Sequence, residues 1–569
     1  MKSLICTTLL VETSPQGLPL GAACIASALK ADARTKNAVS VSLIDFSLED
    51  DEIISAKKSG GDDAIAQFLA NQLASKKPDF IAFSVYVWNR LILEKTCTTL
   101  KKMLPNSICI AGGPEVTADP LSFHNFDFMI SGQGERAMVE LVDSLAKGKK
   151  IDIQGVYTAS AQSGAQTNEI ARACPLPPDM TASPYLDGTL DPSKYGGALW
   201  ELARGCPFKC SYCYESKGEK KIAYFPMERL EKEIELFARK KIAQVFVLDP
   251  TYNASKERAL KMLKTIEKKA PGMFFYFEAR AEFIDRELAY AFSQVPCCLQ
   301  IGLQSANPEV LKNVHRTLDK KKFIKNIGFL NEAGVTFGFD LIYGLPGDTF
   351  AGFCESIDFA LSLYPNNLEL FCLSVLPGTD LHDDAAGFGL NWEKIPPYHV
   401  LKTPTFNEAD LARAKKLAEA TNLFYTKGRA VAWFNSVLHV LKETPSVFLK
   451  KFSDREAVRK FLNSHDNFSA EHTSDKKIEE LQLEFVKERF TEKHMDKYFA
   501  ATEDLIKMHS ALGRCTFDGT ESKFSTHYHP DDIMSEYGTD IVFFTEHCGK
   551  QKCTVQVFVG KNGVDWRTM

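Results

Sequence analysis

Several features that would fix a protein's location or its partners are missing from this sequence. It contains no run of about 18 or more apolar residues, so we expect no membrane-spanning helix. Its start, Met1-Lys-Ser-Leu-Ile-Cys6, lacks the charged region, apolar core and cleavage site of a secretory signal peptide. The formal net charge is −5, so the basic footprint that nucleic-acid binding requires is not indicated.

Cysteine, by contrast, is plentiful. The chain has 15 cysteines, an odd number, and three of them lie close together. In a long chain without a signal peptide, this pattern favours a reducing compartment and a metal site over a disulfide framework. We therefore expect a cytoplasmic protein that binds a metal.

The first 150 residues alternate strand-like and helix-like segments. At 569 residues the whole chain is too long for one hydrophobic core, so we expect several domains. The first, residues 1–150, reads as an open parallel sheet covered by helices. Its predicted strands are Ser3–Leu10, Ser40–Phe46, Phe80–Val87, Ser107–Ala111 and Phe128–Ser131, and its predicted helices include Leu20–Ala31, Ala64–Lys76 and Leu91–Leu104. No G-x-G-x-x-G fingerprint with a following acidic residue occurs, so a nicotinamide cofactor is not indicated.

The remaining residues divide into a linker and two further domains. Residues 151–195 are rich in proline and are predicted to connect domains without a long helix. Residues 196–400 repeat a strand–helix unit, which predicts a partial parallel barrel with its chemistry at the carboxyl ends of the strands. The predicted strands are Ala198–Ala203, Gln244–Leu248, Phe274–Glu278, Leu299–Leu303, Thr336–Ile342 and Leu368–Ser374. Residues 401–569 are expected to be mainly helical, with helices over Ala409–Thr426 and Asp475–Glu503 and a terminal pair of strands, Ile541–Phe544 and Thr554–Val559.

The three clustered cysteines are the most informative residues. Cys206, Cys210 and Cys213 form a C-x3-C-x2-C run directly after the first predicted barrel strand. Three thiolates on one loop can hold three irons of a 4Fe–4S cluster and leave the fourth iron open for a ligand. A structural zinc site is the alternative, but such sites usually pair two C-x2-C halves, and no second half lies nearby.

A C-x3-C-x-aromatic-C loop after the first strand of a partial barrel resembles the radical S-adenosylmethionine (radical SAM) superfamily. Tyr212 fills the aromatic position, and the resemblance covers roughly residues 197–380. It implies that the open iron binds the amino and carboxylate groups of S-adenosylmethionine (SAM). One electron, from a donor such as flavodoxin or ferredoxin, then cleaves the sulfonium and gives a 5′-deoxyadenosyl radical.

The resemblance also suggests which residues contact SAM. Arginine pairs with carboxylates and glutamate with hydroxyl groups, and such residues follow the predicted barrel strands. The candidates are Tyr212, Asp249, Glu278, Arg280, Gln304, Ser305, Gly344 and Pro346. One departure is plain, because the second strand is followed by Leu248-Asp-Pro-Thr251 and not by the family's Gly-Gly-Glu. Asp249 is the candidate for the methionine ammonium in its place.

The N-terminal domain resembles the cobalamin-binding domain fused to many radical SAM enzymes. Ser84-Val-Tyr86 loosely matches that domain's S-x-L element and Gly112-Gly113 its G-G element, whereas its D-x-H-x-x-G element is absent. Because no histidine precedes His124, we expect bound cobalamin to lack a histidine ligand on its lower face. The candidate contacts are Gly17, Leu18, Ser84, Tyr86, Trp88, Asn89, Gly112, Gly113, Pro114, Gly132, Gly134 and Glu135.

The combined prediction is an α/β chain with three parts. They are a Rossmann-like cobalamin-binding domain, a partial (β/α)6 TIM-type radical SAM barrel with a 4Fe–4S cluster, and a mainly helical C-terminal domain related to the substrate. The resemblance implies a cobalamin-dependent methyltransferase that moves a methyl group from SAM, via methylcobalamin, to a poorly activated carbon. Its substrate would be a small molecule or a peptide, with neither nucleic acid nor membrane as a partner.

Three other functions remain open at this point. Cyclisation or rearrangement would use the same cofactors. Methylthiolation is weakened, because that family's N-terminal domain carries its own three-cysteine cluster, and the cysteines before residue 150 here are dispersed. A non-catalytic cobalamin or iron–sulfur sensor is disfavoured by the intact three-cysteine loop. A second metal site is also conceivable in the C-terminal region, from Cys515, His527, His529, His547, Cys548 and Cys553. No ligand spacing repeats there, so surface histidines and buried thiols are the favoured interpretation.

Overall fold

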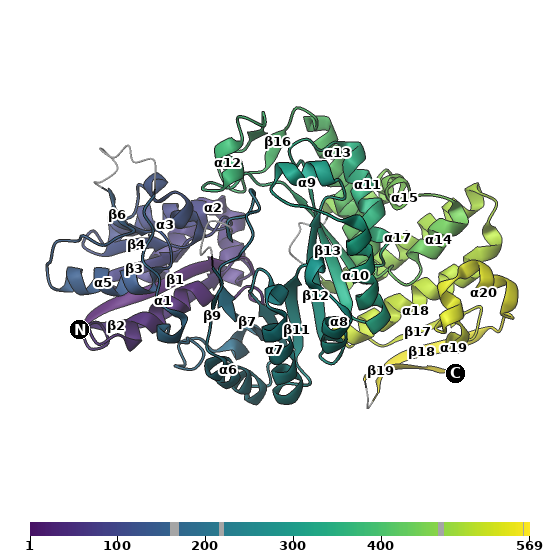
Figure 1. Cartoon of the computed structure of the whole chain (residues 1–569), viewed down its shortest axis with the longest axis horizontal. Coiled ribbons are helices and arrows are strands. Elements are labelled where there is room, and N and C mark those ends of the chain that lie inside the picture. The colour runs from purple at the N-terminus through teal and green to yellow at the C-terminus, as the bar shows by residue number, and fades with distance from the viewer. Residues whose placement is uncertain (160–169, 216–220, 465–470, 561–562) are drawn as a thin grey trace. The chain divides into compact units, whose positions relative to one another are not determined.

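The structure is a computed structural model that describes residues 1–159, 170–215, 221–464, 471–560 and 563–569. The chain divides into two units. Unit 1 comprises Met1–Phe283, Glu287–Cys297 and Ser374–Val400, and unit 2 comprises Ile284–Arg286, Cys298–Leu373 and Leu401–Met569. Figure 1 labels the elements in chain order. No helix in the described ranges has both the length and the apolar character needed to cross a membrane.

Unit 1 begins with a six-stranded sheet in the order β2-β1-β3-β4-β5-β6. The strands are β1 Lys2–Leu10, β2 Val39–Ser47, β3 Phe80–Ser84, β4 Ile108–Gly112, β5 Phe128–Ile130 and β6 Val156–Thr158. The first five pair in parallel, and β6 is antiparallel to β5. The five predicted strands of residues 1–150 are therefore confirmed to within a few residues at their ends.

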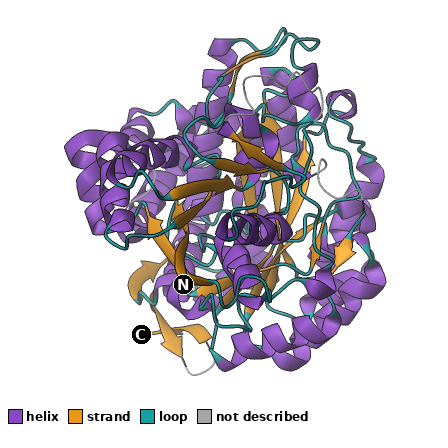
Figure 2. Cartoon of the chain, turned by 90° about the vertical axis from the view of Figure 1, so that its left-hand side faces the viewer, coloured by secondary structure: helices purple, strands orange, loops and turns teal. Residues whose placement is uncertain are grey.

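Helices cover both faces of this sheet (Figure 1, Figure 2). They are α1 Leu20–Ala31, α2 Asp51–Ala74, α3 Arg90–Met103, α4 Pro114–Ala118 and α5 Gly134–Ala146. Side chains of α2 and α3 form one apolar core, and those of α1 and α5 form the other. Because helices bury both faces, β1 has seven consecutive buried residues, most of them apolar, as expected for a central parallel strand.

Unit 1 continues with three parallel strands of the second alternating region. These are β7 Gly197–Trp200, β10 Gln244–Val247 and β11 Phe274–Ala279, with α6 Met227–Arg239 and α7 Lys256–Lys269 between them. The predicted strand Ala198–Ala203 is interrupted, because Ala203–Arg204 leaves it as a short strand, β8, that pairs with β9 Ala223–Tyr224. Unit 1 also includes Ser374–Val400, which we call the cap segment. It contains α12 Asp380–Asp384 and β15 Asn391–Trp392.

Unit 2 holds the other three parallel strands of that region. They are β12 Cys297–Gln304, which begins at the unit boundary, β13 Thr336–Tyr343 and β14 Asn367–Cys372. The helices of this part of unit 2 are α9 Pro308–Asn313, α10 Lys320–Ala333 and α11 Phe350–Leu361. Helix α8 Arg286–Ser293 belongs to unit 1 except for its first residue. All six strands predicted for residues 196–400 are therefore present, three in each unit.

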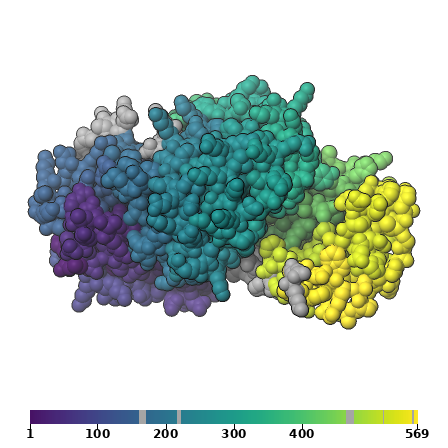
Figure 3. Space-filling view, turned by 60° about the horizontal axis from the view of Figure 1, so that its bottom comes forward, coloured from purple at the N-terminus to yellow at the C-terminus, as the bar shows by residue number. Residues whose placement is uncertain are grey.

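The C-terminal part of unit 2, yellow-green to yellow in Figure 3, is mainly helical, as predicted. Its helices are α13 Glu408–Thr421, the π-helix Asn422–Lys427, α14 Phe434–Leu441, α15 Pro445–Ser453, α16 Glu456–Ser464, α17 Glu471–Glu492, α18 Phe499–Asp518, α19 Pro530–Ile533 and α20 Ile541–His547. Aromatic rings join them, because Phe424 of the π-helix contacts Trp433, Phe448 and Phe485. A sheet in the order β17-β18-β19 follows, formed by Ser522–Thr526, Cys553–Gly560 and Gly563–Thr568.

Two predicted elements of this region differ from the structure. The helix expected over Asp475–Glu503 is two helices, because α17 ends at Glu492 and α18 begins at Phe499. Ile541–Phe544, expected as a strand, forms the start of helix α20. The carboxylate of Asp540 accepts hydrogen bonds from the backbone N–H groups of Val542 and Phe543 and so caps the helix. Ile541 and Phe544 are buried three residues apart, a spacing that places them on one helix face. The predicted strand Thr554–Val559 is confirmed as part of β18.

Candidate functional site

The cysteine loop leaves the sheet immediately after β8. Cys206, Cys210 and Cys213 are all in the reduced state. Cys210 is buried, and the other two are half-buried. A tight turn brings the ends of the C-x2-C pair together, because the backbone N–H of Cys213 donates to the Cys210 carbonyl at 3.1 Å. Burial raises the pKa of the Cys206 thiol, so the loop in its metal-free form favours the neutral thiol at this position.

Asp249 holds the start of this loop in place. Its Oδ1 accepts hydrogen bonds from the backbone N–H groups of Leu202 at 2.8 Å and Ala203 at 3.0 Å. Arg258 supports the same turn, since its NH2 donates to the carbonyls of Leu202 and Phe225. Asp249 is 6% exposed, and burial raises its pKa to about 7. The structure thus gives Asp249 a positioning contact with the residues before the cysteines.

Arg280 lies close to the other side of the loop. Its guanidinium carbon is 3.7 Å from the centroid of the Phe208 ring, between Cys206 and Cys210. The same guanidinium pairs with Glu282 at 2.8 Å. Asn253 fixes the backbone of Arg280 through two reciprocal hydrogen bonds of 2.9 and 3.0 Å. A cation is therefore held against the cysteine loop at the end of β11.

The donor set of the loop fits an iron–sulfur cluster. Three reduced cysteines on one short loop, with a cation beside them, match three-cysteine ligation, and metal binding would displace the thiol protons. Among the described residues, no group of three or more cysteine, histidine or acidic side chains is placed closely enough to hold a metal ion, and this includes the three loop cysteines. The fit therefore rests on the kind and spacing of the donors. In the C-terminal region, His527 is hydrogen bonded through Nδ1 to the buried carboxylate of Asp504 at 3.0 Å.

The predicted SAM contacts fall in both units. Tyr212, Asp249, Glu278 and Arg280 belong to unit 1, where they lie on the cysteine loop or at the ends of β10 and β11. Gln304, Ser305, Gly344 and Pro346 belong to unit 2, where they lie at the ends of β12 and β13. In unit 2 the Ser305 hydroxyl accepts a hydrogen bond from the backbone N–H of Asn307, and Asn313 donates to the carbonyl of Pro346.

The predicted cobalamin contacts gather at the carboxyl edge of the N-terminal sheet. Tyr86 and Trp88 follow β3 and stack with their ring centroids 4.5 Å apart. Trp88 is 45% exposed, so this stack offers an aromatic face at the sheet edge. Gly112 is the last residue of β4, Gly113 and Pro114 follow it, and Gly132, Gly134 and Glu135 follow β5. Gly17 and Leu18 follow β1, where the N–H of Gly17 closes a turn onto the Ser14 carbonyl. Small residues beside a flat aromatic surface fit a large planar ring such as a corrin.

Asn89 is occupied by internal hydrogen bonds. Its amide nitrogen lies 3.0–3.3 Å from the Thr8 hydroxyl and from the carbonyls of Leu9 and Ser84. Its amide oxygen accepts from the backbone N–H of Tyr86 at 2.8 Å. Asn89 therefore ties the end of β1 to the end of β3, and Tyr86 and Trp88 are the members of this segment that present a surface.

Glu135 contacts the cysteine loop. It is 4% exposed, and its Oε1 lies 2.8 Å from NH1 of Arg204, two residues before Cys206. Gln133 accepts a second hydrogen bond from the same nitrogen at 3.0 Å. The predictions placed Glu135 at the cobalamin site but did not anticipate Arg204 as its partner.

The cap segment forms a second connection that the sequence did not reveal. Tyr398 donates its hydroxyl proton to Glu115 at 2.7 Å, and Arg90 donates to both. At the other end of the cap segment, the backbone N–H of Leu381 donates to the carbonyl of Ser211 in the cysteine loop at 2.8 Å. The cap segment therefore contacts both the N-terminal domain and the cysteine loop.

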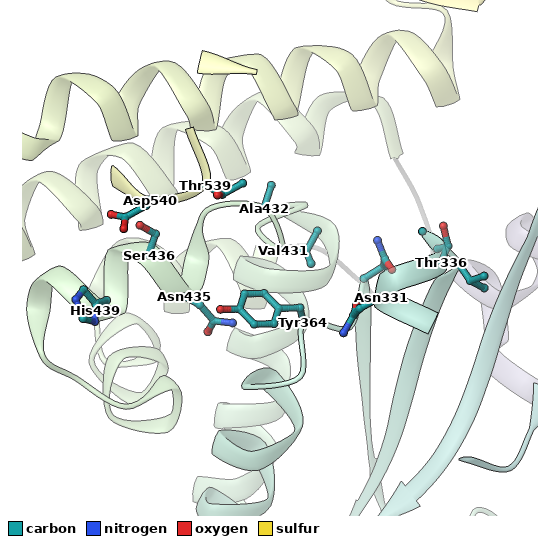
Figure 4. Close-up of a pocket in the computed structure, with 13 residues that line it drawn as sticks. Asn331, Thr336, Tyr364, Val431, Ala432, Asn435, Ser436, His439, Thr539 and Asp540 are labelled. Atoms are coloured by element: carbon teal, nitrogen blue, oxygen red, sulfur yellow. The ribbon is translucent and has the colours of Figure 1, made fainter. Parts of the chain in front are cut away.

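A pocket of about 750 Å³ in unit 2 lies elsewhere in the fold (Figure 4). It is lined at one end by Asn331, Thr336 and Tyr364 and at the other by Ser436, His439 and Asp540. Thr336 is the first residue of β13. The pocket is thus at the amino end of that strand, whereas the predicted chemistry belongs at the carboxyl ends.

Comparison with known proteins identifies two domain families. Residues 200–360 match the family described as Radical SAM superfamily, and residues 7–142 match the B12 binding domain. The cobalamin-dependent radical SAM methyltransferase TokK of Streptomyces tokunonensis is 29% identical over 360 residues, which cover 58% of this chain and 50% of TokK. The 2-(S-pantetheinyl)-carbapenam-3-carboxylate methyltransferase of Streptantibioticus cattleyicolor is 27% identical over 348 residues, which cover 55% of this chain and 50% of that protein. The matched region thus spans half the length of each relative.

A solved structure supports the same fold. The cobalamin-dependent SAM radical enzyme OxsB, with aqua-cobalamin and SAM bound, superimposes with a TM-score of 0.58 at 14% identity. The match covers 87% of this chain and 79% of OxsB. The fold is a Rossmann-like domain followed by a partial (β/α)6 barrel and a mainly helical C-terminal region. Within it, one region of the chain matches the radical SAM superfamily and an earlier region matches the B12 binding domain.

Proposed function

We propose that this chain is a cobalamin-dependent radical SAM methyltransferase that modifies a poorly activated carbon. Its cofactors would be a 4Fe–4S cluster, SAM and cobalamin, and its substrate a small molecule or a peptide. The observation that carries this proposal is the ion pair between Glu135, in the first turn of α5 in the region that matches the B12 binding domain, and Arg204 of β8, two residues before Cys206. The relatives that are named as methyltransferases favour methyl transfer over the other outcomes.

Cys206, Cys210 and Cys213 would hold three irons of the cluster. When bound, the cluster and SAM supply a carbon-centred radical, and cobalamin supplies a transferable methyl group. The protein's task is to seat these groups: Asp249 and Arg258 fix the turn before Cys206, and Arg280 places a positive charge against the loop. An electron donor such as flavodoxin or ferredoxin is part of the proposal.

The remaining SAM contacts are proposed on their positions at the strand ends. Arg280 suits the SAM carboxylate and Glu278 its hydroxyl groups. Tyr212 lies within the cysteine loop, and Gln304, Ser305, Gly344 and Pro346 complete the set from unit 2. Because both bonds of Asp249 Oδ1 go to backbone N–H groups, we propose that Asp249 acts by holding the loop.

For cobalamin we propose that Tyr86 and Trp88 close the lower face. Their stacked rings present an aromatic surface after β3, and no histidine precedes His124 in this chain. Bound cob(II)alamin should accordingly give an electron paramagnetic resonance spectrum without nitrogen superhyperfine splitting from the protein.

Product analysis tests the function. Protein reconstituted anaerobically and given SAM, hydroxocobalamin and titanium(III) citrate is expected to form both 5′-deoxyadenosine and S-adenosylhomocysteine, measured by liquid chromatography and mass spectrometry. Cys210→Ala should lose the iron–sulfur absorbance and 5′-deoxyadenosine, because a two-cysteine loop cannot complete the site. Cys553→Ala, in β18 of unit 2, is the matched control and should retain both. Deoxyadenosine alone would favour rearrangement, and neither product would favour a sensor.

A further inference from the structure

Two buried glutamates occupy equivalent places after neighbouring strands of the B12-binding domain. Glu115 lies in the first turn of α4, after Gly112-Gly-Pro114, and Glu135 lies in the first turn of α5, after Gly132-Gln-Gly134. Both are at most 6% exposed. Burying a carboxylate is costly unless it is paired, so the partners of these two side chains indicate what each one holds.

Glu135 holds the entrance to the cysteine loop. Its partner Arg204 is also bound by Glu201, with Nε and NH2 donating to the two carboxylate oxygens at 3.2 and 3.0 Å. Arg204 is only 14% exposed in its side chain. Although burial alone would lower the pKa of Arg204, Glu201 and Glu135 keep it above the ordinary arginine value. Arg204 is thus a fixed cation between the B12-binding domain and Cys206.

Glu115 holds the middle of the same loop through the cap segment. Tyr398 and Arg90 both donate to its Oε2, at 2.7 and 3.3 Å. The cap segment then passes close to α4, where a Cβ on Gly378 would lie 3.2 Å from Cα of Ala118. It reaches the carbonyl of Ser211, between Cys210 and Cys213, through the N–H of Leu381.

We propose that Glu135–Arg204 and Glu115–Tyr398 are positioning pairs that set the distance between the cobalamin and the iron–sulfur cluster. This inference rests on the proposed function. The first pair joins the residues after β5 to Arg204, just before the cysteine loop, and the second joins the residues after β4 to the cap segment, whose Leu381 contacts that loop. The first pair thus acts on the loop at its start and the second acts through the cap segment. Two cofactors that act on one carbon must be held to within a fraction of an ångström, and a shift of about 1 Å can lower the rate about hundredfold.

The test measures that distance directly. Reconstituted protein is reduced so that both the cluster and cob(II)alamin are paramagnetic, and pulsed electron paramagnetic resonance gives the distance distribution between them. Arg204→Lys keeps the charge but loses the fork that bridges Glu135 and Glu201. Tyr398→Phe removes one hydroxyl and leaves the Arg90–Glu115 pair in place. Lys101→Met, which breaks an ion pair with Asp127 at the opposite edge of the same sheet, is the matched control.

The expected result is that all three variants bind about four irons and one cobalamin, while only Arg204→Lys and Tyr398→Phe broaden or shift the distance distribution. The yield of S-adenosylhomocysteine relative to 5′-deoxyadenosine should fall in the same two variants. Fully loaded variants with the wild-type distribution would overturn the inference and leave the proposed function standing. Wild-type protein that binds iron but no cobalamin would overturn both. An equal change in Lys101→Met would show that the pairs merely stabilise the domain.

Discussion

The two units bury charged side chains for different purposes. In unit 1, Arg204 pairs with Glu135 and Glu201, and these residues lie at strand ends and in the loops that follow them. In unit 2, Glu443 pairs with Arg489 and Lys451 and thereby joins the segment after α14 to α17 and α15. The chemistry of the bonds is the same, yet the first set fixes loops and the second fixes helices. A buried ion pair therefore indicates a functional site only where it holds a loop that carries cofactor ligands, and not where it holds helices together.

The largest effect on stability is expected in unit 2, where Arg489→Met tests this distinction. The change leaves Glu443, which is 6% exposed in its side chain, with only the half-exposed Lys451 as a partner. Removing one partner of a buried pair costs about 3–5 kcal/mol. We expect the urea midpoint to fall by a corresponding amount, while the molecules that remain folded bind iron and cobalamin like the wild type.

Lys477→Met is the control on the same helix. Lys477 pairs with Glu480 at 2.9 Å, but both side chains are about half exposed, so the loss should be about 1 kcal/mol or less. Reduced cofactor binding by folded Arg489→Met would contradict the distinction between the units. The Arg489–Glu443 pair, which holds helices of unit 2 together, would then also affect the cofactor sites.

A smaller effect, which depends on pH, is expected at Asp249 in unit 1. Burial raises the pKa of this carboxyl to about 7, with Arg258 opposing and Glu201 reinforcing the shift. Between about pH 4 and pH 7 the folded protein therefore keeps a proton that the unfolded chain has released, so stability falls as the pH rises through this window. The slope from this single group is at most about 1.4 kcal/mol per pH unit.

Asp249→Asn should remove that slope. The amide oxygen can still accept from the N–H groups of Leu202 and Ala203, so the loop keeps its support without a buried charge. In urea unfolding at pH 5 and pH 8, the free energy of unfolding of the variant should increase relative to that of the wild type as the pH rises. Parallel stability profiles for the two proteins would mean that the carboxyl is not neutral at the lower pH. Unchanged iron binding by the variant would fit the proposed role of Asp249 as a support for the loop.

The sequence predicted local features well and side-chain partners poorly. The strands, and the cysteine loop after the first barrel strand, follow from apolar runs and from residues that are adjacent in the chain. The Glu135–Arg204 pair joins positions 69 residues apart and the Glu115–Tyr398 pair positions 283 apart, and no local pattern links them. Asp249 was assigned to a ligand because it ends a strand, but its hydrogen bonds to Leu202 and Ala203 appear only when β7 and β10 are paired. Ile541–Phe544 was misassigned because four residues are too few to separate a strand from a helix.

The smallest effect on stability is expected at Gly113, where a single methyl group tests whether the loops of unit 1 carry function. Gly113 has φ +108°, and an added Cβ would lie 2.6 Å from the carbonyl oxygen of Val85. Gly113→Ala must therefore push the loop after β4 away from the loop after β3, which carries Tyr86 and Trp88, at a cost of about 1–3 kcal/mol.

Gly61→Ala separates this displacement from the cost of the backbone conformation. Gly61 also has a positive φ, of +62°, but an added Cβ would meet nothing within 4 Å. Both variants should lose some stability in urea, and only Gly113→Ala should bind hydroxocobalamin more weakly, as followed by absorbance titration. Equal cobalamin affinity in the two variants would show that the spacing of these loops does not govern cofactor binding. The contrast between contacts that hold loops in unit 1 and contacts that hold helices in unit 2 would then depend on the results for Arg204 and Tyr398.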